Sequence, residues 1–327
     1  MIRTTLSLLV IAVAFECIGA QGPTVRWYKG NTHTHTLNSD GDSTPEEVVK
    51  WYRDNGYNFL VVTDHEKITP VEPLNKLFGK PGELLVISGQ EITDRAEGRP
   101  HHVNALGITT VSLPKKAPTS LENLQANIDA AIALGGVPQI NHPNFGWALT
   151  AETLSKTKRG MLFELFNGHP LVNNMGGGGS PSTEEIWDAV LSNGRLIYGM
   201  ATDDVHTVRK LGDRASATPG HGWVMVRAAE LTPRSILEAL ASGDFYATTG
   251  VELENYSADK RAIVVKVKEK RGSKYRIQFI GKHGKLLQEI PAGSATYTVR
   301  GDDGYVRTKI LESNGSVAWT QPLLVNK

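Results

Sequence analysis

The sequence predicts an α/β fold rich in parallel strands, followed by a small antiparallel β domain. Short apolar runs of strand length alternate with helical patterns, which is the order expected of βαβ units. Titratable residues follow these runs, at the strand ends where α/β barrels carry their sites. Beyond about residue 250, apolar and polar residues alternate, as in antiparallel strands with one solvated face. We therefore expect a larger domain over residues 21–250 and a β-sandwich-like domain over residues 251–327.

The first twenty residues are typical of a cleavable signal peptide (residues 1–20). A short basic start precedes an apolar run over residues 6–15, and small residues end at Ala20. The run is shorter than the roughly 20 apolar residues of a spanning helix, so we expect a secreted or periplasmic protein without a membrane anchor. The only cysteine, Cys17, lies in this segment, so metal ligands in the mature chain would be nitrogen and oxygen atoms.

The formal net charge of +1 gives no argument for binding to nucleic acid or to an acidic membrane surface. Lys and Arg are scattered, and no stretch interleaves them with aromatic residues as a nucleic-acid groove would. We expect a small-molecule substrate as the partner and no nucleic acid, and the composition specifies no oligomeric state.

The first predicted strand, about residues 25–28, leads into a pair of histidines, His33 and His35. Residues two apart in an extended segment point to the same face, so both imidazoles can hold one cation. An exposed loop is the alternative interpretation. Asp40 follows in a Ser-Asp-Gly turn.

Helix and strand patterns then alternate up to residue 250. Thr44 and Glu47 form a capping box that begins a helix ending near Gly56. The strands expected next span residues 57–62, 84–88, 102–108, 137–140, 161–166 and 195–200. The later helices expected span residues 121–134, 186–191 behind a capping box at 182–185, and 236–241.

The tail alternates over residues 261–269 and 275–279, as antiparallel strands do. Residues 313–316 are typical of a hairpin turn between strands at 305–311 and 317–319. Because the tail carries one histidine and no cluster of ligands, we expect a structural role, with ligand binding as the alternative.

Most of the ten histidines lie at or near predicted strand ends: His33, His35, His65, His101, His102, His142 and His206. The carboxylates that accompany them are Asp40, Asp64, Glu91, Asp203 and Asp204. A single histidine is more often a hydrogen-bonded core or loop residue, but this many at corresponding positions predict a metal site. Imidazole and carboxylate without thiolate suit Zn, Mn or Fe. A carboxylate such as Glu91 can bridge two ions about 3.5–4 Å apart.

These motifs, in this order, resemble those of the PHP (polymerase and histidinol phosphatase) superfamily. They are His33-x-His35, Ser-Asp40-Gly, Thr-Asp64-His65, Gly-x-Glu91-Ile, a mid-chain histidine, His142 and Asp204-x-His206. Phrases at residues 102–107, 141–144, 202–206 and 317–322 are similar to the secreted carbaryl-hydrolase-like branch of that superfamily. The resemblance implies a distorted (β/α)7-type barrel of the PHP kind, followed by the β domain.

The resemblance also implies the metal ligands. A first ion would take His33, His35, Glu91 and Asp204, and a second would share Glu91 and add His102 and His142. A third ion, not bound in every member, would use Asp40, His65 and His206. Only one of His101 and His102 can face inward from a strand, and the family phrase selects His102. The Asp-x-His spacing selects Asp204 over Asp203.

Other polar residues, His101 and Asp203 among them, are candidates for supporting or substrate contacts. Asp64 is expected to orient an imidazole from outside the ligand set. Glu164 and Asn167 have either a supporting role or a substrate contact, with an ordinary structural role as the alternative. A guanidinium matches phosphate geometry, so loop arginines are candidates for the cavity mouth, with a solvated loop charge as the alternative. These arginines are Arg95, Arg99, Arg209 and Arg214.

The expected function is that of a metal-dependent hydrolase, in which two or three divalent ions activate water without a protein nucleophile. Phosphoester hydrolysis is the leading hypothesis, from the superfamily resemblance and the loop arginines. Hydrolysis of a carbamate, ester or amide is favoured by the narrower branch, and a non-catalytic, metal-stabilised binding protein is a remote alternative. No G-x-S-x-G motif is present, and the export signal disfavours polymerase-associated proofreading.

Overall fold

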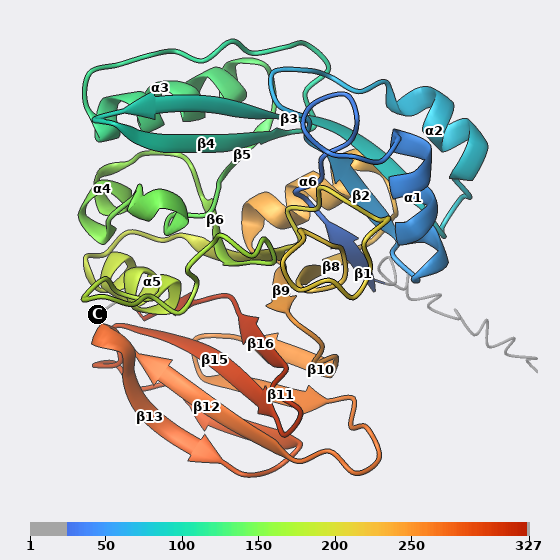
Figure 1. Cartoon of the computed structure of the whole chain (residues 1–327). Helices are drawn as coiled ribbons and strands as arrows, with labels where there is room; N and C mark the ends of the chain where they lie inside the picture. The colour runs from blue at the N-terminus through green and yellow to red at the C-terminus, as the bar shows by residue number, and fades with distance from the viewer. Residues whose placement is uncertain (1–24, 326–327) are drawn as a thin grey trace, which may run out of the picture.

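A computed structural model describes residues 25–325, which form a larger α/β domain and a β domain beside it (Figure 1). The predicted signal peptide and Cys17 lie outside the described residues. Within residues 25–325, no helix has both the length and the apolar character needed to cross a membrane.

The larger domain is built on one curved, mixed sheet. Its strands are β1 (Arg26–Asn31), β2 (Phe59–Val62), β3 (Leu85–Ala96), β4 (Arg99–Leu106), β5 (Val137–Ile140), β6 (Leu162–Asn167), β7 (Tyr198–Thr202), β8 (Trp223–Ala228) and β9 (Phe245–Thr248). They pair in the order β9-β8-β1-β2-β3-β4-β5-β6-β7. The pairs β1–β2, β2–β3, β5–β6 and β6–β7 are parallel, as the α/β prediction requires.

The prediction of parallel strands is wrong at β4, which pairs antiparallel with both β3 and β5. Strand β3 does not end near Ser88 but continues to Ala96, and only Glu97 and Gly98 separate it from β4. Both turn residues have a positive φ, 52° and 75°, as in a tight hairpin. Because two residues leave no room for a crossover helix, the returning strand must be antiparallel.

The helices of the larger domain are α1 (Pro45–Asp54), α2 (Val71–Phe78), α3 (Ser120–Ala133), α4 (Ala151–Lys156), α5 (Thr183–Ser192) and α6 (Pro233–Ser242), with a 3₁₀ turn η1 (Phe145–Trp147); a second 3₁₀ turn, η2 (Lys282–Gly284), lies in the β domain. Helices α1 to α5 lie on the outside of the curved sheet (Figure 1), whereas α6 packs with the apolar residues inside it. Both predicted capping boxes are confirmed, with Thr44 and Ser182 as the caps of α1 and α5. Helices α2 and α4 were not predicted, because eight and six residues span too few turns to show a helical period.

Strand β2 is buried on both faces, as its continuous apolar run predicts. Phe59 and Val61 pack inside the curved sheet with Met200. Leu60 and Val62 pack on the other side, with apolar residues of α1 and α2. Apolar side chains therefore fill the inside of the sheet below the carboxyl ends of the strands, and the polar residues gather above them.

The extensions of β1 and β7 meet beyond the strand ends. The His35 N–H donates to the Val205 carbonyl at 2.9 Å, within an isolated parallel bridge between Thr34 and Val205. Among the described residues, no strand pairs with the free edge of β7. The Gln321 side chain forms hydrogen bonds with this edge: it accepts from the Gly199 N–H and donates to the Gly199 carbonyl. A closed seven-unit barrel therefore stays a prediction.

The C-terminal domain is a sandwich of two antiparallel sheets. Its strands are β10 (Leu253–Ala258), β11 (Ala262–Val267), β12 (Tyr275–Gly281), β13 (Lys285–Ile290), β14 (Ser294–Thr298), β15 (Tyr305–Glu312), β16 (Val317–Thr320) and β17 (Leu323–Leu324). Strands β10, β11 and β14 form one layer, and β13, β12, β15 and β16 form the other. The predicted turn between β15 and β16 is confirmed. Strand β16 also pairs with β9, so one sheet continues from the larger domain into the sandwich.

Candidate metal centre

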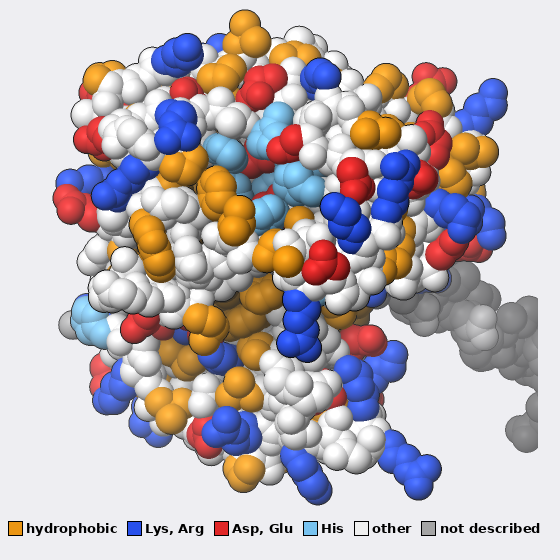
Figure 2. Space-filling view, viewed as in Figure 1, with side chains coloured by type: hydrophobic (Ala, Val, Ile, Leu, Met, Phe, Trp, Pro, Cys, Tyr) orange, Lys and Arg blue, Asp and Glu red, His pale blue; other side chains and the backbone are white. Residues whose placement is uncertain are grey.

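The carboxyl ends of the strands in the larger domain carry a compact cluster of histidines and carboxylates, which surrounds a hollow in Figure 2. The structure brings together all nine residues predicted as metal ligands: His33, His35, Asp40, His65, Glu91, His102, His142, Asp204 and His206. They fall into overlapping groups of three or four whose ligand atoms lie within 4.8 Å of one another.

Glu91 lies at the centre of this cluster, on the part of β3 that extends beyond Ser88. Its Oε2 lies 3.0 Å from His33 Nε2 and 3.1 Å from His35 Nε2. Its Oε1 lies 2.9 Å from His102 Nδ1 and 3.4 Å from His142 Nε2. Oε2 also lies 3.4 Å from His65 Nδ1. The two carboxylate oxygens therefore face different imidazoles, which is the arrangement of a carboxylate that bridges two ions.

Asp204 completes the group around His33 and His35. Its Oδ1 lies 3.2 Å from Nε2 of both rings. Asp204 follows the end of β7 and has a φ of 51°, and His142, after β5, has a φ of 20°. Residues other than glycine rarely adopt positive φ, and such strained positions cluster at functional sites.

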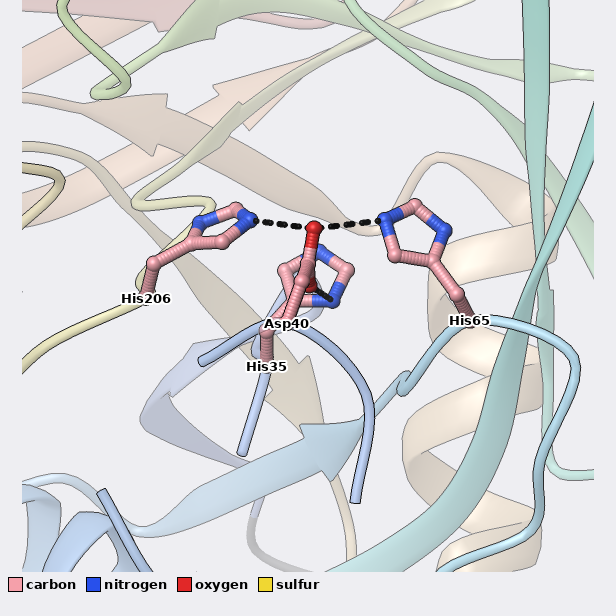
Figure 3. A group of neighbouring side chains, drawn as sticks. All are labelled: His35, Asp40, His65 and His206. Atoms are coloured by element: carbon pink, nitrogen blue, oxygen red, sulfur yellow. Dashed lines mark ion pairs between the residues drawn. The ribbon is translucent and has the colours of Figure 1, made fainter. Parts of the chain in front are cut away.

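A third group, drawn in Figure 3, consists of His35, Asp40, His65 and His206. Asp40 Oδ2 lies 3.4 Å from Nε2 of both His65 and His206. Asp40 Oδ1 lies 3.5 Å from Nδ1 of His35, whose ring stacks between the other two imidazoles at centroid distances of 4.6 and 4.3 Å. His35 therefore joins the groups, with one ring nitrogen toward Glu91 and the other toward Asp40.

Strand alternation separates His102 from His101, as the sequence analysis expected. His102 faces Glu91, whereas His101 lies 3.1 Å from Asn123 Oδ1 in α3, on the opposite face of β4.

Asp203 points away from the cluster, whereas Asp204 points into it. The Asp203 carboxylate accepts hydrogen bonds from the Tyr52 hydroxyl at 2.8 Å and from the backbone N–H groups of His221 and Gly222 at 2.7 and 3.0 Å. Burial raises the pKa of Asp203 in spite of these donors. Asp203 therefore fixes the segment before β8 and does not contact the cavity.

Glu164 lies beneath the cluster and does not line the cavity. Its Oε1 lies 2.6 Å from His33 Nδ1, and its Oε2 accepts from the His142 N–H and from Asn167 Nδ2, each at 2.7 Å. Asn167 Nδ2 also donates to Asp204 at 3.0 Å. A carboxylate on the far ring nitrogen fixes the tautomer, so that His33 Nε2 offers its lone pair to the cluster. Of the alternatives for Glu164 and Asn167, these contacts favour the supporting role.

The expectation that Asp64 orients an imidazole is wrong. Among the described residues, its carboxylate accepts hydrogen bonds from Thr36, Ser39 and Thr69 and from no histidine. Neighbouring residues of an extended segment point in opposite directions, so Asp64 faces away while His65 faces the cluster. Asp64 instead anchors the loop that carries Asp40.

The carboxylates of the cluster attract positive charge. Burial acts to lower the pKa of His33, but the charges of Asp204, Glu91 and Glu164 raise it well above its ordinary value. Burial acts to raise the pKa of Glu91 and of Asp204, but the surrounding histidines lower both well below their ordinary values. Divalent ions would supply the positive charge that this arrangement favours.

One buried nitrogen without a hydrogen-bond partner also indicates a place for a bound metal ion. His35 Nε2 is buried and has no hydrogen-bond partner, although a carboxylate oxygen lies 3.1 Å away. A buried polar atom left in this way costs free energy, and a cation held between the nitrogen and the oxygen would satisfy both. Nitrogen and oxygen donors without thiolate suit Zn, Mn or Fe. The number of ions and the ligands of each ion stay predictions.

The cavity above the cluster has a volume of about 260 Å³. Besides the predicted ligands, Phe145, His169 and Leu171 line it. None of these three residues was predicted from the sequence, although His169 follows the end of β6, where site residues of α/β folds are expected. The Leu171 N–H donates a hydrogen bond to His169 Nδ1 at 3.2 Å. The other ring nitrogen, Nε2, takes no part in this hydrogen bond.

No arginine or lysine is among the described residues that line this cavity, so the prediction for the loop arginines is wrong. Arg95 and Arg99 flank the β3–β4 turn, where they donate to backbone carbonyls. Four residues of extended strand carry Arg95 about 13 Å from Glu91. Arg209 is paired with Glu47, with Nη2 and Oε2 at 2.6 Å. Arg214 also does not line the cavity.

The comparisons with known proteins concern the fold. No family model and no curated protein matches the sequence. The chain is similar to a two-domain protein from Bacteroides vulgatus described as containing a predicted PHP-like metal-dependent phosphoesterase, with a TM-score of 0.53 and 17% identity over 93% of this chain and 100% of that chain. An amidohydrolase from Chromobacterium violaceum, with bound sulfate and no metal, is 15% identical over 54% of this chain and 87% of that chain, with a TM-score of 0.39.

The first of these matches shows a shared two-domain fold. This fold does not bear on the narrower carbaryl-hydrolase-like branch.

Proposed function

We propose that this protein is a metal-dependent hydrolase of the PHP superfamily and that it acts on a phosphoester. The observation that carries the proposal is the position of Glu91, with one carboxylate oxygen facing His33 and His35 and the other facing His102 and His142. Divalent ions held by these residues would supply Lewis acidity, which would polarise the ester and lower the pKa of a bound water.

The residues of this chain hold and orient the groups around the reaction. Glu164 and Asn167 fix His33 and Asp204 from below. The strand ends keep the imidazoles converging on one space, so the ester can be bound in a single orientation. No Ser or Cys lines the cavity among the described residues, which agrees with attack by water.

Matched substrates test the proposal directly. The protein, loaded in turn with Zn, Mn and Fe, is assayed on para-nitrophenyl phosphate, bis-para-nitrophenyl phosphate and a para-nitrophenyl carbamate, which share one leaving group. We expect metal-dependent turnover of a phosphate ester that a chelator and Glu91→Gln abolish. Turnover of the carbamate alone contradicts the phosphoester proposal.

A carbamate, carboxylic ester or amide is the second candidate substrate, and one observation favours it. Phe145 and Leu171 line the cavity, and no Arg or Lys accompanies them within the described residues. A neutral substrate requires no guanidinium, so this lining suits it. A metal-loaded protein that turns over neither class would support the third candidate, a non-catalytic binding protein.

We also propose that the protein acts outside the cytoplasm, on the N-terminal sequence alone. Fractionation of cells that express the full chain should find it in the periplasm or the medium, shortened at its N-terminus by about 20 residues. Retention of the full-length chain in the cytoplasm contradicts this proposal.

A further inference from the structure

His169 lines the metal cavity but belongs to none of the candidate ligand groups among the described residues. It follows β6, and its ring lies against the ring of His206, with the two centroids 5.2 Å apart. The ring of Phe145 lies 5.1 Å from the ring of His142 and 6.5 Å from that of His169. His169 therefore borders the space above the cluster, where a substrate would lie, without being a predicted ligand.

The two nitrogens of the His169 ring have different roles. Nδ1 accepts a hydrogen bond from the Leu171 N–H at 3.2 Å, so this nitrogen carries a lone pair and the ring proton is on Nε2. In the part of the chain that the structure describes, no hydrogen bond involves Nε2. His169 therefore has a free N–H donor for a group in the cavity.

The neighbouring ring of His206 has the opposite arrangement. Its Nδ1 lies 2.9 Å from the backbone carbonyl oxygen of Asp204, which can only accept a hydrogen bond. The His206 proton is therefore on Nδ1, and Nε2 carries the lone pair that a metal ion requires. Of these two adjacent rings, His206 is prepared for a cation, whereas His169 is prepared for an oxygen atom that accepts a hydrogen bond.

Hydrogen bonds hold His169 in a fixed place relative to the cluster. The Asn167 side chain accepts from the His169 N–H at 2.8 Å and donates to the Asp204 carboxylate at 3.0 Å. The Val172 N–H donates to the His169 carbonyl at 3.0 Å, which closes the turn after β6. A single amide, that of Asn167, thus connects the backbone of His169 to a predicted metal ligand.

We propose that His169 is a catalytic residue of this hydrolase, and that its Nε2–H donates a hydrogen bond to a phosphoryl oxygen of the substrate. A donor that is already in place stabilises the charge on this oxygen as the bond to the leaving group breaks. The proton stays on Nε2 throughout, so His169 does not act as a general acid. The inference rests on the proposed function, because it requires a phosphoester at the metal cluster.

The position of the proton can be measured without turnover. NMR spectra of the zinc-loaded protein with ¹⁵N-labelled histidine distinguish a ring nitrogen that carries a proton from one that carries a lone pair. The signals that are missing from His169→Phe belong to His169. We expect the proton on Nε2 and the lone pair on Nδ1. A proton on Nδ1 overturns the inference, whichever substrate the protein hydrolyses.

Kinetics test whether the donor acts on the substrate. His169→Phe keeps a ring but removes the donor, so kcat for para-nitrophenyl phosphate should fall about 100-fold. Elemental analysis should find the same metal content as in the wild type. His169→Gln, which can place an amide N–H near the position of Nε2, should recover part of the activity. His283→Phe, at an exposed position in the β domain, is the matched control and should leave kcat unchanged.

A second leaving group separates this role from proton transfer. The fall in kcat should be equal for phenyl phosphate, whose leaving group is poorer, because both esters present the same phosphoryl oxygens. A much larger fall for phenyl phosphate would mean that His169 protonates the leaving group, which overturns the proposed contact.

The remaining outcomes distinguish the inference from the proposed function. An unchanged kcat in His169→Phe overturns the inference and leaves the proposed function standing. Loss of metal from His169→Phe would make His169 a ligand and also overturns the inference. A metal-loaded wild type that hydrolyses no phosphate ester overturns the phosphoester proposal and the role of His169 together.

Discussion

Several imidazoles of the cluster are held from behind by groups that do not face the cavity. Glu164 Oε1 lies 2.6 Å from His33 Nδ1, and the Thr93 hydroxyl lies 2.5 Å from His65 Nδ1. The backbone carbonyl of Asp204 lies 2.9 Å from His206 Nδ1. Such contacts select one tautomer and one ring orientation, so the ligand atoms converge before any ion binds.

Glu164→Gln tests this orientation at the scale of one residue. The amide keeps the shape of the side chain but removes the charge that fixes the His33 tautomer, so metal affinity should fall about 10- to 100-fold. Competition with a chelator measures the change. Glu238→Gln, at an exposed position, is the matched control. Equal metal affinities in the wild type and both variants would contradict the role of Glu164 in orienting His33.

Rules that use only neighbouring residues predicted which of two adjacent residues faces the metal cluster, because backbone geometry alone determines that direction. Alternation along an extended strand separated His102 from His101, and the Asp-x-His spacing separated Asp204 from Asp203. The same rules did not find the contacts of Asp64 with Thr36 and Ser39 or of Arg209 with Glu47, since those contacts join segments far apart in the sequence.

At the scale of elements, strands β1 and β2 approach closely at Gly30. A Cβ at Gly30 would lie 2.2 Å from the ring of Phe59, which is fully buried and cannot move aside. The close approach sets the direction in which β1 continues to His33. The absence of a side chain at residue 30 is therefore part of how the site is positioned.

Gly30→Ala should destabilise the fold by about 1–3 kcal/mol, because it overpacks this contact. Urea denaturation followed by circular dichroism measures the loss. Gly301→Ala is the control, since its added Cβ would have no neighbour within 4 Å. A difference between the two variants of less than about 0.5 kcal/mol contradicts the packing argument.

The caps of α1 and α5 and the double burial of β2 were predictable from the sequence because each depends on residues close together in the chain. The reversal at β4 was not. The polar residues Gln90 and Glu91 continue a strand that the apolar pattern ends at Ser88. Glu91 faces the metal cluster, whereas Gln90, on the opposite face, forms hydrogen bonds with the backbone of Ser112. Function interrupts the hydrophobic pattern there, so the pattern gives the wrong strand end.

At the scale of the whole molecule, a buried ion-pair network joins α5 to β15. Arg307 is 1% exposed and lies 2.7 Å from Asp188 and 3.4 Å from Glu184, and Lys309 lies 2.5 Å from Glu184. The helix of the larger domain is thereby attached to the sandwich.

This network predicts a pH dependence of stability. Burial acts to raise the pKa of Glu184, but Arg307 and Lys309 lower it below the ordinary value. The stabilisation is therefore present above the unfolded pKa and is lost as the pH falls through the folded pKa, below about pH 4. Glu184→Gln should lose this part of the pH dependence. The measurement is the difference in unfolding free energy between about pH 6 and about pH 3. Parallel curves for the two proteins would contradict the assignment.

The boundary expected near residue 250 crosses a continuous sheet. Ala318 and Trp319 of β16 pair with Thr248 and Ala247 of β9, and Tyr305 and Trp319 lie in the core under α5. A chain cut after residue 250 would expose the β9 edge and part of that core, so we expect it to be aggregated or unfolded. Gel filtration and circular dichroism of residues 21–250, beside residues 21–327, test this. A monomeric, folded fragment contradicts it.

The most direct test of a shared multimetal centre is elemental analysis of the purified protein and of Glu91→Gln, each shown to be folded by circular dichroism. We predict about two or three transition-metal ions per wild-type chain, and the loss of at least one ion in the variant because Glu91 faces both imidazole pairs. A wild-type chain without stoichiometric metal, or a variant that keeps the full complement, would contradict the central claim.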